Sequence, residues 1–127
     1  MTNDEGRDGP KRARFDLEER TARFGEAVIA FARRISVTPI TEPLIRQVVR
    51  SSTSIGANYC EADDAGSMKE FRYRISVCRR ESRESKHRLR MIAAAFPEGK
   101  DEARCLWREA KELNLIFAAI YRSKKKP

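Results

Sequence analysis

Histidine is almost absent from this sequence, since His87 is the only one, and this scarcity excludes several kinds of active site. Glu84 and His87 form a Glu-x-x-His pair of the type that binds metal in di-iron bundles, but those centres need the pair twice. A serine nucleophile usually needs a histidine base, and no Gly-x-Ser-x-Gly elbow occurs. The phosphate-binding loop Gly-x-x-x-x-Gly-Lys is also absent. We therefore expect a protein that is not an enzyme and that uses no metal or cofactor.

Cysteine is scarce as well, and its three positions, Cys60, Cys78 and Cys105, include no Cys-x-x-Cys pair. An odd and widely spaced set argues against a disulfide framework and against a zinc ribbon. We expect three reduced thiols in or near a helical core. The carboxylates that follow the first cysteine are Glu61, Asp63 and Asp64. A cluster of this kind at a helix end is more often solvated than bound to a cation.

Long apolar runs are missing, and none approaches the roughly 20 residues of a transmembrane helix. The first residues, MTNDEGRDGPKRARFD, lack the apolar core of a signal peptide. Hydrophobic residues make up 40% and charged residues 36% of the 127 positions, which is typical of one charge-rich globular domain. We expect a soluble, cytoplasmic protein without membrane contact.

Apolar residues recur at alternating steps of three and four, which is the spacing of amphipathic helices. Four such seams predict helices over about residues 16–36, 41–66, 67–96 and 100–122, with Pro and Gly at the breaks. A repeat near 3.5 is typical of helices that cross at shallow angles. We therefore predict an all-α, antiparallel up-down four-helix bundle over residues 15–122. Residues 1–14 and 123–127 are predicted to be disordered tails, the second of them basic.

Two of the predicted helix starts carry capping signals. Thr41 can cap the second helix, and Pro43 is tolerated in its first turn. Ser67 and Glu70 form a Ser-x-x-Glu capping box at the start of the third helix.

The net charge of +8 is unevenly distributed, because residues 67–94 carry nine Lys or Arg against three Glu. Five basic residues of the third helix share a narrow arc beside the apolar seam, and we call them the basic stripe: Arg72, Arg79, Arg83, Lys86 and Arg90. The stripe is roughly 27 Å long, comparable with several phosphate spacings of a nucleic acid. Aligned like charges repel each other unless an anion is near. The stripe therefore predicts a surface that binds nucleic-acid phosphates.

A second apolar face of the third helix lies roughly opposite the seam and comprises Tyr73, Val77 and Met91. A helix that is apolar on two sides is buried in a larger core or against another subunit. Since only four helices are available, this face predicts an oligomer interface.

The stretch 51–95, SSTSIGANYCEADDAGSMKEFRYRISVCRRESRESKHRLRMIAAA, resembles a known family. The family comprises bacterial four-helix-bundle proteins first noticed as products of intervening sequences in 23S ribosomal RNA genes. Its pattern is Ser-Ile-Gly-Ala-Asn-x-x-Glu-Ala followed by Ser-x-Lys-Glu-Phe, which here are Ser54–Ala62 and Ser67–Phe71. The similarity extends over most of residues 15–122.

The resemblance implies a homo-oligomer, typically a pentamer that forms a barrel with a central channel, and no catalytic residues or cofactor. The family includes the accessory variability proteins of diversity-generating retroelements, which are strongly basic and bind a reverse transcriptase and nucleic acid. Many relatives have neutral or apolar residues where this chain has Arg79, Arg80, Arg83, Arg88 and Arg90. This difference strengthens the expectation of a polyanionic partner.

The first family motif includes Ser54, Gly56, Asn58 and Glu61. A glycine in a helix interior, such as Gly56, costs about 1 kcal/mol relative to Ala. A tight contact with a neighbouring helix would explain that cost, so the small residues of the motif predict a close approach of the second helix to its neighbours. We expect Asn58 and Glu61 to be hydrogen-bonding groups that orient the helices, and not catalytic groups.

Three functional hypotheses follow from these features. The first is a non-enzymatic, oligomeric nucleic-acid-binding or scaffolding protein that uses the basic stripe. The second is a protein-interaction adaptor whose basic face docks on an acidic partner such as a retroelement reverse transcriptase. The third is an assembly in which Asp63 and Asp64 of one subunit neutralise the basic stripe of the next.

Overall fold

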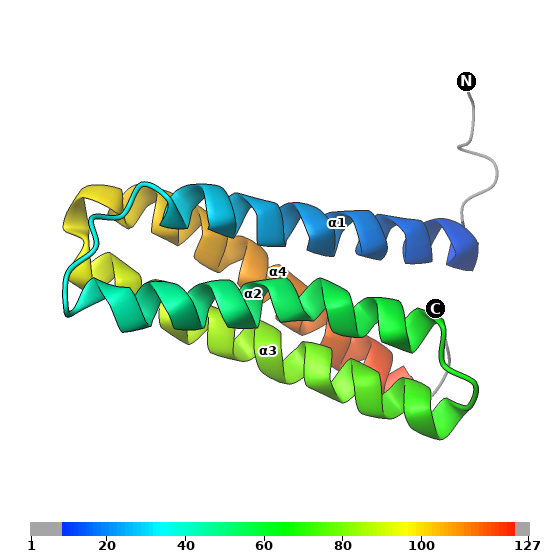
Figure 1. Ribbon diagram of the computed structural model, residues 1–127. Helices are drawn as coiled ribbons and strands as arrows, with labels where there is room; N and C mark the ends of the chain where they lie inside the picture. The colour runs from blue at the N-terminus through cyan, green and yellow to red at the C-terminus, as the bar shows by residue number, and fades with distance from the viewer. Residues whose placement is uncertain (1–8, 124–127) are drawn as a thin grey trace.

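The computed structural model describes residues 9–123, with side chains from residue 17 onward, and its regular structure in this range is entirely helical. Four long helices run side by side, and each is antiparallel to the next along the chain (Figure 1). The elements are α1 (Gly9–Ala32), α2 (Thr41–Asp63), α3 (Met68–Ala95), the 3-10 turn η2 (Pro97–Gly99) and α4 (Lys100–Ser123). The predicted helical bundle is confirmed. The predicted tails fall mostly on residues 1–8 and 124–127, outside the described residues, and α1 already begins at Gly9.

α3 is the central helix of the packing, with extensive contacts to both α2 and α4. α1 packs mainly on α2 and much less on α4. No helix in the described part of the chain combines the length and apolar character of a membrane span.

The apolar seams form the core of the bundle. Each of the four helices contributes side chains that are almost completely buried, including Val28, Phe31, Val48, Ile55, Ile75, Leu89, Ile92, Leu113 and Phe117. Burial of one such side chain contributes roughly 1.5–3 kcal/mol, whereas an exposed ion pair contributes at most about 1 kcal/mol. The core, and not the many surface charges, therefore stabilises this fold.

The start of α2 differs from the prediction, since Thr41 does not cap this helix but is its first residue. The Thr38 hydroxyl accepts the backbone N–H of Thr41 at 3.0 Å, and the Thr41 hydroxyl donates to the Ser36 carbonyl at 2.6 Å. The turn at Pro39 places the Thr38 hydroxyl next to the first turn of α2. Thr38, three residues before Thr41, therefore satisfies the backbone N–H that has no partner within the helix. At α3, Ser67 caps as predicted, and its hydroxyl accepts from the Glu70 backbone at 3.1 Å.

α1 ends at Ala32 and not near Ser36, because its last turn tightens. The Arg34 N–H bonds the Phe31 carbonyl and the Ile35 N–H bonds the Ala32 carbonyl, both three residues back. The turn folds toward the bundle, and Ile35 remains buried although it lies outside the helix.

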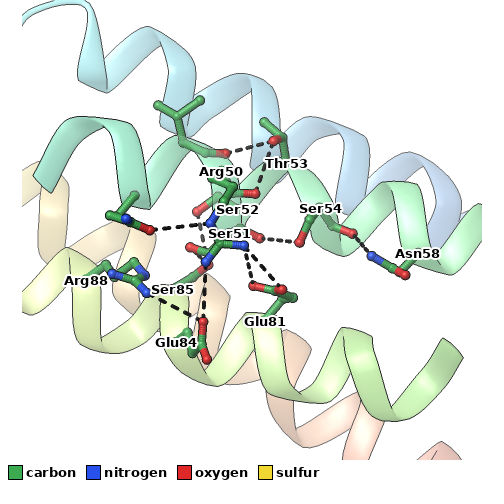
Figure 2. Close-up of polar contacts among 12 residues, drawn as sticks. Arg50, Ser51, Ser52, Thr53, Ser54, Asn58, Glu81, Glu84, Ser85 and Arg88 are labelled. Atoms are coloured by element: carbon green, nitrogen blue, oxygen red, sulfur yellow. Dashed lines mark hydrogen bonds and ion pairs between the residues drawn. The ribbon is translucent and has the colours of Figure 1, made fainter. Parts of the chain in front are cut away.

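Only small side chains lie between α2 and α3 along part of their length. Ser51, Ser52 and Ser85 are fully buried, and the Ser85 hydroxyl lies 2.9 Å from that of Ser51 and 3.1 Å from that of Ser52 (Figure 2). These hydroxyls satisfy one another, so the two helices approach closely without leaving buried polar groups unpaired.

Gly56 marks the corresponding close approach of α2 to α1. A Cβ atom at this position would lie 3.2 Å from the Thr21 hydroxyl oxygen, which is tighter than ordinary van der Waals contact. At Gly25 of α1, a Cβ would lie 3.6 Å from the Thr53 Cα atom. Gly56 of the first family motif therefore brings α2 close to α1, and Ser51 and Ser52, just before that motif, bring it close to α3.

Candidate nucleic-acid interface

The basic stripe lies on the side of α3 that borders α4, where two half-buried aromatic residues of α4 face it. The Arg72 guanidinium lies 4.2 Å from the centre of the Tyr121 ring and donates to the Tyr121 carbonyl at 2.5 Å. Arg79 lies 5.6 Å from the same ring. The Lys86 ammonium lies 5.7 Å from the centre of the Trp107 ring. Contacts of a cation with an exposed aromatic ring contribute about 0.5–1 kcal/mol each, so they position these side chains without neutralising them.

None of the five stripe residues forms an ion pair with a carboxylate of the described chain. The arginines that do form such pairs lie elsewhere: Arg20, Arg23, Arg34, Arg46, Arg50 and Arg88. The stripe therefore keeps its full positive charge, while these six arginines are compensated.

Glu81 and Glu84 of α3 face α2 and not the stripe. Glu81 is buried and accepts from Arg50 at 3.4 Å, and Glu84 lies 3.5 Å from Arg50 and 3.6 Å from Arg88 (Figure 2). This network holds both carboxylates on the far side of the helix, so no acid interrupts the basic stripe.

α4 adds a second line of positive charge that sequence reasoning missed. We call it the α4 row, and it contains Lys100, Arg104, Arg108, Lys111 and Arg122. These residues fall within roughly a quarter turn of the helix and share that arc with no carboxylate. Two acids of α4 pair away from the row, since Glu109 pairs with Arg20 of α1 and Glu102 with Arg34, just beyond the end of α1. Because basic and acidic residues nearly balance in this helix, net charge alone hides the row, although its spacing is visible in the sequence.

The basic stripe and the α4 row meet across a groove between α3 and α4. The groove has a volume of about 500 Å³. Leu89, Ala93 and Trp107 are among its apolar lining residues, and Arg90, Arg104 and Arg108 are among the basic ones. No carboxylate lines it. Trp107 lies between the two lines of charge, with Lys86 of α3 at 5.7 Å and Lys111 of α4 at 5.6 Å from its ring centre.

The predicted oligomer face is only partly on the surface. Tyr73 is 58% exposed and Met91 is half-buried, but Val77 is only 5% exposed within the single chain. Val77 lies on the side of α3 that faces α2, one turn from Arg74 and Glu81, which both bond residues of α2. The prediction that Val77 belongs to an exposed face is therefore wrong, because packing against α2 covers it.

The polar residues of the family motif differ in what they contact. The Asn58 side chain donates to the Ser54 carbonyl at 2.9 Å and accepts from Arg74 of α3 at 3.0 Å, so it joins the two helices. The Ser54 hydroxyl donates to the Ser51 carbonyl within α2. Glu61 is exposed and forms no hydrogen bond or ion pair with another residue whose side chain the structure describes.

No group of three or more metal-ligating side chains occurs among the described residues. Glu84 pairs with Arg50 and Arg88, and His87 is exposed one turn away. Of the cysteines, Cys78 is fully buried, whereas Cys60 and Cys105 are exposed.

Thiol reactivity should follow this burial. Burial raises the pKa of Cys78 to about 12, and burial together with the charges of Glu18, Asp63 and Glu61 raises the pKa of Cys60. Because a raised pKa leaves little thiolate at pH 8, we expect slow reaction of Cys60 with Ellman's reagent, with a rate that increases above pH 9. Cys78 should react only after unfolding in urea. Rapid reaction of all three thiols in the folded protein would contradict this assignment.

Comparison with solved structures supports the fold. A crystal structure of a protein with unknown function from the S23 ribosomal protein family of Bacteroides thetaiotaomicron matches with a TM-score of 0.74 and 18% sequence identity. The match covers 86% of this chain and 97% of that chain. No family model and no curated protein matches the sequence. The chain therefore has the fold of this S23 ribosomal protein family member, in agreement with its sequence resemblance to the 23S intervening-sequence proteins.

Proposed function

We propose that this protein is a non-enzymatic, oligomeric, cytoplasmic protein that binds nucleic acid through its basic stripe. The observation that carries the proposal is the absence of carboxylate partners for the stripe within the described chain. Like charges at these helical spacings destabilise a helix by about 0.2–0.5 kcal/mol per pair. Bound phosphates would remove that repulsion, and a polyanion would do so at several positions together.

The stripe is suited to phosphates and not to base sequence. Arg79, Arg83 and Arg90 are exposed on one side of α3, and a guanidinium group can bind phosphate oxygens in a bidentate manner. Contacts to phosphates fix position and affinity but read no bases. We therefore expect binding that depends on charge and shape, and little on sequence.

Self-association forms part of the proposal, and a pentamer is the state that the family resemblance implies. Exposed apolar side chains are available for it, among them Tyr73 and, on α4, Leu115, which is 53% exposed. An oligomer would place several basic stripes on one particle, so that contacts too weak singly would act together.

Salt dependence tests the phosphate contacts. Fluorescence anisotropy with the full-length protein and a labelled structured RNA should show much weaker binding at high salt. Five phosphate contacts predict a slope of about −4.5 in log K against log salt, which is roughly a 500-fold loss between 50 and 200 mM salt. An affinity that does not change over this range would overturn the proposal.

A second candidate function is an adaptor that docks on an acidic protein surface, such as a reverse transcriptase of a retroelement. The same unpaired positive charge supports it, because a basic face suits any strongly acidic partner. A pull-down that survives nuclease treatment, together with no binding to purified nucleic acid, would select this function. A neighbouring reverse-transcriptase gene with a repeat pair would favour the retroelement role. A location of the gene within an insertion in a ribosomal RNA gene would favour a role associated with ribosomal RNA.

A further inference from the structure

We propose that the groove between α3 and α4 binds an unpaired base of a single-stranded nucleic acid, with Trp107 as the surface on which the base stacks. The inference rests on the proposed function and narrows its ligand, because phosphate contacts alone do not distinguish a single strand from a duplex. Three features of the groove support it: its size and apolar lining, its charge, and the position of its aromatic residues.

The groove has the dimensions and lining of a site for a planar group. Its volume of about 500 Å³ lies within the roughly 300–1,000 Å³ range of small-ligand sites. Leu89 and Ala93 of α3 line it together with Trp107 of α4. Trp107 is half-buried, so the packing holds the indole in place while part of it remains accessible from the groove.

The charge of the groove matches a ligand with a phosphate on each side of a base. Arg90 stands on one helix, and Arg104 and Arg108 stand on the other, while no carboxylate lines the groove. Arg104 and Arg108 are exposed and form no ion pair with the described residues. A positively charged groove that contains an aromatic side chain for stacking is the arrangement that binds single strands with little sequence preference.

The lysines beside Trp107 do not prevent stacking. Lys86 and Lys111 lie 5.7 and 5.6 Å from the ring centre, and both are long, flexible side chains. A base stacked on an aromatic ring contributes more than an exposed cation near the same ring. The base would therefore displace an ammonium group, which could then bind the phosphate of the same nucleotide.

A second aromatic residue extends the track along α4. Tyr121 lies fourteen residues beyond Trp107, roughly 21 Å along the helix axis, and Arg72 and Arg79 of the basic stripe lie over its ring. A strand that stacks at Trp107 could thus follow the stripe toward Tyr121. A duplex has no free base faces, so it would contact only the basic side chains.

The fluorescence of the protein reports the groove directly, because Trp107 is the only tryptophan in the sequence. Full-length protein should be titrated with three ligands at one salt concentration: a labelled 12-nucleotide single strand, the same sequence as a duplex, and a strand of equal length without bases. We expect all three to bind by anisotropy, but only the strand with unpaired bases should quench Trp107. Binding of all three without quenching would overturn this inference and leave the proposed function standing.

Variants at Trp107 separate stacking from charge. Trp107→Leu should weaken single-strand binding by about 5- to 150-fold and leave duplex binding unchanged, since each stacked base contributes about that factor. Trp107→Phe keeps an aromatic face and should retain most of the affinity. Circular dichroism and thermal unfolding check that each variant is folded. If a variant does not fold, the quenching experiment on the unchanged protein still tests the inference.

The remaining outcomes distinguish other ligands of the same groove. If no nucleic acid binds at all, the proposed function fails together with the inference. If adenosine monophosphate binds as tightly as the strand, the groove is a site for free nucleotides and the inference is wrong. If polyglutamate quenches Trp107 as strongly as the strand, an acidic polypeptide is the ligand and the inference is again wrong.

Discussion

Changing Arg79, Arg83 and Arg90 together to glutamate is expected to abolish nucleic-acid binding. All three side chains are exposed, and none pairs with a carboxylate in the described chain, so the change removes phosphate contacts and adds repulsion. We expect a loss of affinity of more than about 100-fold at 100 mM salt, and a salt slope smaller by about 0.9 for each phosphate that the variant no longer binds. Anisotropy with a labelled RNA measures both quantities.

A matched control reverses the same number of charges on the other side of the bundle. Arg23 of α1, Arg33 just beyond the end of α1 and Arg46 of α2 are exposed, and changing them to glutamate alters the net charge by the same amount. This control should keep most of the affinity, because net charge acts at long range whereas the stripe acts by contact. Equal losses in the two triple variants would show that total charge, and not the stripe, governs binding.

The same variants distinguish a binding surface from a subunit interface. If Asp63 and Asp64 of one subunit neutralise the stripe of the next, the stripe variant should become monomeric by light scattering. If the stripe binds nucleic acid, the variant should keep the molar mass of the unchanged protein. A monomeric stripe variant would therefore favour the assembly role of the stripe over the proposed function.

Changing Gly56 to leucine is expected to destabilise the bundle by about 3 kcal/mol or more, at or beyond the upper end of usual overpacking costs. Thr21 blocks the space, since its hydroxyl oxygen would lie 3.2 Å from the new Cβ atom. Thr21 is almost completely buried and donates to the Leu17 carbonyl at 2.8 Å, so it cannot move aside easily. The better helix propensity of leucine, about 0.8 kcal/mol, is too small to offset the clash. Urea unfolding measures the change in the free energy of unfolding.

Gly66 offers the control for this substitution. A Cβ atom there would meet no heavy atom within 4 Å, so Gly66→Leu should change the free energy of unfolding by less than about 0.5 kcal/mol. An unchanged urea midpoint for Gly56→Leu would show that α1 and α2 can separate without loss. The close-packing role of the family motif would then be wrong.

Most of the fold was accessible from local patterns in the sequence. Steps of three and four predict an amphipathic helix because 3.6 residues make one turn, and apolar residues at this spacing, such as Ile75, Leu89 and Phe117, are buried in the bundle. Ser67 caps α3 for an equally local reason, since its hydroxyl reaches a backbone donor only three residues away. The predictions for Thr41 and Val77 were wrong because they depend on non-local structure. The role of Thr41 depends on the turn that precedes α2, and the burial of Val77 depends on packing against α2.

The candidate site shows where local patterns end. Arg79, Arg83 and Arg90 could be assigned to one face of a helix from their spacing alone, because that relation depends only on helical geometry. The packing of the helices was needed to show that the α4 row lies beside this face, that Glu109 is turned toward Arg20 of α1 and that Glu102 is turned toward Arg34, just beyond the end of α1. It also places Trp107 between Lys86 and Lys111. Most of these contacts join residues far apart in the chain, and they depend on which helices pack together and at what rotation. The spacing of residues within any single helix does not contain that information.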